Sequence, residues 1–129
     1  MLPHVKLITS SDAPASQGPF SPALSADGWV FLSGQGGFDP ATGELVADDI
    51  EAQTAQTLAN VEALLRAAGA SLDNVVSCLV HLRDLDDFES FNRVYEARFG
   101  DPKPVRTTVG AKLVAGMRVE ITVVARRPE

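Results

Sequence analysis

The spacing of hydrophobic residues predicts short strands at both ends of the chain, with two helices among them. Each expected strand is a short apolar run bounded by turn residues. Asp27-Gly28 lies between two of these runs and favours a hairpin, because glycine accepts the positive φ that such turns need. Residues 114–117 are expected to form a second hairpin between the last two strands. The expected strands are residues 1–8, 23–25, 29–33, 75–82, 107–113 and 118–125.

A three- and four-residue spacing of the less polar positions predicts a long helix in the middle of the chain. Asp48 or Asp49 can cap its start, and Gly69 is expected to end it. The stripe mixes aliphatic residues with threonines, so we interpret it as one face packed on a sheet rather than as a membrane-seeking helix. Its members are residues 50, 54, 57, 58, 61, 64, 65 and 68.

A second helix is predicted after the strand at residues 75–82. Asp86 or Asp87 is its expected cap, and residues 100–102 are expected to stop it with a glycine and a proline. Four aromatic residues follow one side of this helix, and we interpret them as core. They are Phe88, Phe91, Tyr95 and Phe99.

Together these elements predict one α+β domain over residues 1–129, with a mixed sheet of five or six strands and both helices packed on one face. The strand at residues 75–82 is largely apolar on both sides, since Cys78 and Val80 alternate with Leu79. Strands of this kind need cover on both faces, and helices on one side cannot supply it. We therefore expect the second face to be buried in a homo-oligomer.

Composition narrows the class of protein. The chain is 45% hydrophobic, yet no apolar run approaches the ~20 residues of a membrane-spanning helix, so we expect a cytoplasmic protein with no membrane partner. The single cysteine, Cys78, excludes an intrachain disulfide and favours a reducing compartment. The net charge of −6 argues against nucleic acid as a partner, because neutralising phosphates needs a basic field.

Arg106 is the strongest candidate for ligand binding. A guanidinium at the end of a strand can bind a carboxylate through two parallel hydrogen bonds. The alternative interpretation is an arginine that is simply solvated at the strand end. Residues 101–129 hold six bases against three acids, so this part of the chain carries a local charge of +3. His4 and His81 are isolated in the sequence, so it offers no metal site, and we expect no metal or other cofactor.

The residues in this order resemble the RidA/YjgF family of small enamine and imine deaminases over essentially the whole chain. Single motifs are weak, but their shared order is specific. The motifs are Ala13-Pro-Ala15, Gly18-Pro-Phe-Ser21, Ser33-Gly-Gln35, Asp39-Pro40 with Thr42-Gly43, Gln53-Thr54, Asn60, Ala68-Gly69, Asp87-Phe88 with Asn92 and Tyr95, Pro104-Val-Arg106, and Val119-Glu-Ile121.

The resemblance implies a chorismate-mutase-like homotrimer with sites in the clefts between subunits, and a cofactor-independent hydrolysis of 2-aminoacrylate and related 2-imino acids to 2-keto acids and ammonia. By position, Arg106 would bind the substrate carboxylate and Glu120 would orient or activate water. The neighbouring subunit would supply the cleft wall, and Asn92 would help to hold the cleft. The wall residues are Phe20, Ser33 and Gly34.

Three features of the chain depart from the family pattern. Phe20 stands where tyrosine is common, so a hydroxyl is missing from the cleft wall, and Thr108 replaces a common cysteine but still offers a hydroxyl for substrate binding. The separation of Arg106 and Glu120 is one residue shorter than usual, so the strand register decides whether their side chains meet. A hairpin with a three-residue loop would place both, with Thr108, on one face.

Other functions remain open on the sequence. The chain could act on another small keto, imino or cyclic acid, or bind a carboxylate ligand without chemistry, because Arg106 alone suffices for binding. Ribonuclease activity, which is also described for this family, is the least favoured function. The chain is acidic and has no basic stripe interleaved with aromatic residues.

Overall fold

A computed structural model describes residues 4–129 and contains six strands and two α-helices, as predicted. Three short 3₁₀ turns lie at Leu72–Asn74, Leu85–Asp87 and Val114–Gly116. The part of the first expected strand at residues 1–3 lies outside the described residues. The strands are β1 (Val5–Ile8), β2 (Ala23–Ala26), β3 (Trp29–Leu32), β4 (Val75–Leu82), β5 (Val105–Gly110) and β6 (Val119–Arg126), and the helices are α1 (Ile50–Ala67) and α2 (Phe88–Arg98).

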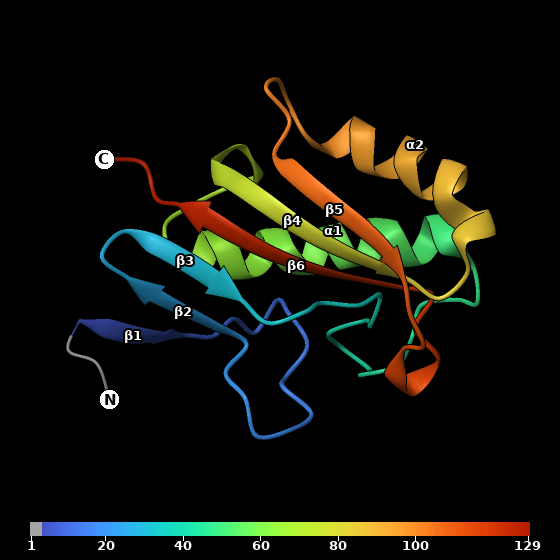
Figure 1. Cartoon of the computed structure of the whole chain (residues 1–129). Helices are drawn as coiled ribbons and strands as arrows, with labels where there is room; N and C mark the ends of the chain where they lie inside the picture. The colour runs from blue at the N-terminus through green and yellow to red at the C-terminus, as the bar shows by residue number, and fades with distance from the viewer. Residues whose placement is uncertain (1–3) are drawn as a thin grey trace.

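The strands form one mixed sheet in the order β1-β2-β3-β6-β4-β5 (Figure 1). β4 pairs in parallel with β5 and antiparallel with β6, so it lies between the two last strands. The expected hairpin of β5 and β6 is therefore wrong. α2 makes the crossover that a parallel β4–β5 pair requires, and the chain then passes through the turn at residues 114–116 to pair β6 on the other side of β4.

The first predicted hairpin is confirmed. β2 and β3 pair antiparallel, with Ala26 opposite Trp29. Asp27 and Gly28 connect them with φ values of 52° and 86°, which is the left-handed backbone that a two-residue hairpin turn needs.

The helix boundaries agree with the capping pattern, with one difference. The Asp49 carboxylate accepts a hydrogen bond from the Ala52 amide at 2.8 Å and caps α1, and Gly69 follows the helix with a φ of 81°. For α2, neither Asp86 nor Asp87 provides the side-chain cap. Asp87 stands at the N-cap position without such a bond, and Asp84 instead caps the 3₁₀ turn that precedes the helix, where it accepts from the Asp86 amide at 2.9 Å.

Both helices pack on the same face of the sheet, as predicted, and the core lies between them and the strands (Figure 1). On the strands this face carries fully buried residues such as Val80, Val119 and Val123. The opposite face, here called the open face, is covered by no helix among residues 4–129 and exposes several large apolar side chains. They include Phe31 (46% exposed), Val76 (40%), Leu79 (38%), Val105 (72%) and Val109 (40%).

Two buried amide side chains of α1 hold the irregular segment that follows β3. Asn60 donates to the carbonyls of Gly36 at 3.0 Å and Phe38 at 2.9 Å. Gln53 donates to the Ala47 carbonyl at 2.7 Å and accepts from the Arg118 amide at 2.8 Å, so it also joins α1 to the start of β6. Both side chains are fully buried, and their hydrogen bonds satisfy backbone groups that water cannot reach.

Replacing Gln53 by leucine is expected to lower the free energy of unfolding by about 2–4 kcal/mol, because it leaves a carbonyl and an amide without partners in the interior. Urea denaturation at fixed protein concentration measures the change. The control is Glu51→Leu on the same helix, whose exposed carboxylate pairs with Arg93 at 2.9 Å. That variant should lose less than about 1 kcal/mol. Equal losses in the two variants would contradict a structural role for the buried amide.

Candidate active site

Arg106 lies on β5 and projects from the helix-covered face of the sheet. It is opposite Cys78 of β4, which is buried beneath the helices, and side chains opposite each other share a face. Its guanidinium carbon lies 4.8 Å from the ring centroid of Tyr95, 5.5 Å from that of Phe91 and 5.7 Å from that of Phe88. Three aromatic rings of α2 therefore orient the cation by packing and by cation–π attraction.

The polar atoms around this arginine lack partners. Asn92 lies on the same side of α2 as the three rings, and Thr108 follows Arg106 on the same face of β5. Three buried oxygens make no hydrogen bond: Asn92 Oδ1, Thr108 Oγ1 and the Tyr95 hydroxyl. Among residues 4–129, Arg106 itself forms no ion pair. We call Arg106, Asn92, Tyr95 and Thr108 the arginine pocket.

Burial changes the titration of the two weak acids beneath Arg106. Burial is the main cause that raises the pKa of the Tyr95 phenol well above its usual range, and the neighbouring Cys78 thiol adds to the effect. Burial likewise raises the pKa of the Cys78 thiol. Both groups are therefore neutral near pH 7, and Cys78 is not activated as a nucleophile, because the thiolate is the reactive form.

Glu120 lies on the open face, on the other side of the sheet from Arg106. It is directly opposite His81 of β4, and the distance from its Oε1 to His81 Nδ1 is 3.9 Å. Gly34 lies against the same carboxylate. A Cβ at this glycine would be 2.6 Å from Glu120 Cδ, so any other residue at position 34 would require the carboxylate to move.

Ser33 ties the loop that carries Phe20 to this group. The Ser33 hydroxyl donates to the Ser21 carbonyl at 2.6 Å, and the Ser33 amide donates to the Pro22 carbonyl at 3.0 Å. Phe20 is 52% exposed. We call Glu120, Gly34, Ser33 and Phe20 the glutamate wall.

The expectation that Arg106, Thr108 and Glu120 share one face is wrong. The intervening strand β4 sets the register: Cys78 stands opposite Arg106, and His81 stands opposite Glu120. Three steps separate Cys78 from His81, and alternation places side chains an odd number of steps apart on opposite faces. The structure thus divides the candidate residues into an arginine pocket and a glutamate wall.

Sequence reasoning missed two features. His81 was considered isolated, yet it is next to Glu120, and only knowledge of the β4–β6 register could have shown this. The aromatic residues of α2 were assigned to the core alone. Phe91 and Tyr95 are buried, but Phe88 is 39% exposed and all three rings surround the arginine. The signal available in the sequence was the spacing of these aromatic residues along one side of the helix, shortly before the strand that carries Arg106.

Within residues 4–129, no group of three or more histidine, cysteine or acidic residues lies together in a way that could hold a metal ion. In the same part of the chain, neither helix combines the length and the apolar character needed to cross a membrane.

Comparison with known proteins assigns the chain to a family. The profile of the family described as Endoribonuclease L-PSP matches residues 10–127, which is most of the chain. The chain belongs to this family. A RutC family protein of Pyrococcus horikoshii is 41% identical over 121 residues, which cover 93% of this chain and 96% of that protein. The RidA/YjgF resemblance stated from the motifs is thereby confirmed.

Two further relatives of the Endoribonuclease L-PSP family bear on chemistry and fold. The 2-iminobutanoate/2-iminopropanoate deaminase of Bos taurus is 40% identical over 121 residues, covering 93% of this chain and 88% of that protein. The crystal structure of Escherichia coli TdcF with bound serine superposes with a TM-score of 0.89 at 32% identity, covering 95% of this chain and 99% of the other. The sheet with two helices on one face is therefore the family fold.

Tyr95 is the only tyrosine of the chain, so its ionisation can be followed directly by ultraviolet absorbance. We expect the native phenol to remain neutral at pH 11, because burial raises its pKa, whereas the urea-unfolded chain should titrate at about pH 10. Between these values the unfolded chain binds fewer protons, so stability should fall as pH rises above about 10. A native titration that coincides with the unfolded one would contradict the buried position of the ring.

Proposed function

We propose that this chain is a deaminase that hydrolyses 2-imino acids, including those formed from 2-aminoacrylate, to 2-keto acids and ammonia. One observation carries the proposal: Arg106 is held by aromatic rings on one side and has no anionic partner among residues 4–129. Asn92, on the same side of α2 as these rings, and Thr108, on the same face of β5 as Arg106, carry buried oxygens without a partner. A small carboxylate with a polar group next to it would satisfy both the charge and these hydrogen-bonding atoms.

The relatives support this choice of ligand. Several are named 2-iminobutanoate/2-iminopropanoate deaminase, at about 40% identity. Escherichia coli TdcF has bound serine, a small molecule with an α-carboxylate. A ribonuclease is the weaker proposal, in spite of the family's description, because a chain with a net charge of −6 repels the phosphate backbone.

The two groups of residues lie on opposite faces of one sheet, so we propose that each complete site forms between two copies. The arginine pocket of one subunit would meet the glutamate wall of the next. The exposed apolar side chains of the open face support an assembly that covers them, because so large an apolar surface is unfavourable in water. A closed homotrimer repeats this contact three times and leaves none unused.

In such a site the reaction needs few groups. Arg106 would fix the substrate carboxylate, and the neighbour's Glu120 would accept a proton from water as the water oxygen bonds to the imine carbon. The electron pair of the C=N bond moves to nitrogen. The proton held by Glu120 passes to that nitrogen and gives a carbinolamine. The hydroxyl proton then moves to the nitrogen through the same carboxylate as the C–N bond breaks, so that ammonia leaves and the carbonyl of the keto acid forms.

The test supplies 2-imino acids from an amino-acid oxidase and traps unreacted imine with semicarbazide. Wild-type protein should lower the amount of semicarbazone, and Arg106→Ala should reduce kcat/KM about 100-fold, since it loses a charged, bidentate hydrogen bond. Arg66→Ala is the control, because this arginine is exposed on α1 and, among residues 4–129, pairs only with Glu62, at 3.6 Å. Full activity in Arg106→Ala would remove the basis of the proposal.

The shared site has its own test. Arg106→Ala and Glu120→Gln proteins, each strongly impaired alone, should reach about a quarter of the wild-type activity when their subunits are mixed by unfolding and refolding together. Random assortment then pairs an intact arginine pocket with an intact glutamate wall in about one site in four. Sites contained within one subunit would regain nothing. Mass measurement in solution checks that wild type and mixture assemble alike.

A carboxylate-binding protein without catalysis is the second candidate. Phe20 favours it, because the glutamate wall has an apolar ring where the family pattern has a tyrosine hydroxyl. Recovery of the trapped imine in unchanged amount, together with Arg106-dependent binding of a stable 2-keto acid, would identify this function.

A further inference from the structure

His81 and Glu120 form a cross-strand pair on the open face. Nδ1 of His81 is 3.9 Å from Glu120 Oε1, and the two side chains are 26% and 28% exposed. Nδ1 is itself buried and makes no hydrogen bond. The nitrogen and the half-buried carboxylate are too far apart for a direct hydrogen bond. A shared proton, after a small movement, or a bridging water would give this buried nitrogen a partner.

The other charged groups near His81 pair with residues other than His81, so Glu120 is its partner. On β5 the residue opposite His81 is Val109, which carries no charge. Arg83 directly follows β4 and Arg118 directly precedes β6, and both lie within 4 Å of Asp48, at 3.6 Å and 2.7 Å. Arg118 also pairs with Asp87 at 3.3 Å. Among residues 4–129, Glu120 is thus the ionisable group that pairs with His81.

We propose that His81 is the proton partner of Glu120, a positioning residue for the deaminase reaction proposed above, on which this inference rests. The His81 imidazole would take from Glu120, through one water or after a small side-chain rotation, the proton that the carboxylate received from the attacking water. The carboxylate is then free again while the tetrahedral adduct forms. The proton returns by the same route to the departing nitrogen, so no proton is gained or lost by the pair.

This role gives the site a pH dependence that a passive neighbour would not. An imidazole can accept a proton only in its neutral form, and histidine is the side chain whose ordinary charge change falls between about pH 5 and pH 8. The advantage provided by His81 is therefore expected at high pH and should disappear at low pH.

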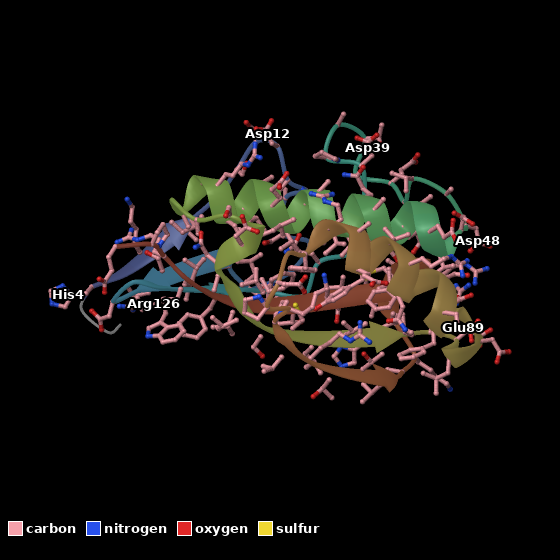
Figure 2. The ribbon with its side chains drawn as sticks, turned by 90° about the horizontal axis from the view of Figure 1, so that it is seen from above. His4, Asp12, Asp39, Asp48, Glu89 and Arg126 are labelled. Atoms are coloured by element: carbon pink, nitrogen blue, oxygen red, sulfur yellow. The ribbon has the colours of Figure 1, made fainter. Side chains whose placement is uncertain are left out.

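The experiment compares wild type with His81→Asn, whose amide nitrogen can still bond to Glu120 but cannot accept a proton. We expect kcat for imine hydrolysis to fall about tenfold at pH 8, with KM within about twofold, and the difference to shrink to about twofold or less at pH 5.5. His81→Gln provides a second amide if the first variant assembles poorly. The control is His4→Asn, since His4 is the other histidine of the sequence and is exposed just before β1. Figure 2 shows it at the end of the molecule opposite Glu89, which lies in the first turn of α2, a few residues after the end of β4.

The outcomes separate this inference from the proposed function. A loss in kcat that is the same at every pH would show that His81 only shapes the surface, and would overturn the inference. An unchanged kcat at pH 8 would overturn it as well. If Arg106-dependent hydrolysis persists in either case, the deaminase proposal stands alone. Wild type that hydrolyses no imine at any pH would overturn both.

Discussion

The alternation of side chains across a β-sheet is the constraint on which this molecule depends. β4 is the shared neighbour of β5 and β6, so its register relates every residue of one strand to the other. Arg106 falls on the face covered by helices, and Glu120 falls on the open face. No rotamer can bring the two side chains together through a sheet, so a reaction that uses both needs two copies of the chain.

The two faces of the sheet therefore have different roles. The covered face contains the hydrophobic core and, at its edge on β5, the arginine surrounded by aromatic rings of α2. The open face carries exposed apolar side chains together with the glutamate and His81. An assembly that buries the apolar part of the open face would also exclude water around the carboxylate, which strengthens the electrostatic interactions within the site.

Local hydrogen bonds give the glutamate wall its shape. The segment after β3 lies between α1 and β6, and the amides of Asn60 and Gln53 hold its flanks. Gly34 lies against the Glu120 carboxylate because any Cβ there would displace it. The segment that carries Gly34, beside the Glu120 carboxylate, is thus attached at its far side to buried polar groups of α1.

The sequence by itself determined the elements, because strand and helix periodicity, the Asp27-Gly28 turn and the Asp49 cap are local properties of a few neighbouring residues. It also determined the candidates Arg106 and Glu120, through the types and order of residues. Only the tertiary structure decided that β6 pairs with β3 and β4, not with β5 in a hairpin. That pairing joins segments far apart in the chain, and it alone places Arg106 and Glu120 on opposite faces and His81 beside the glutamate.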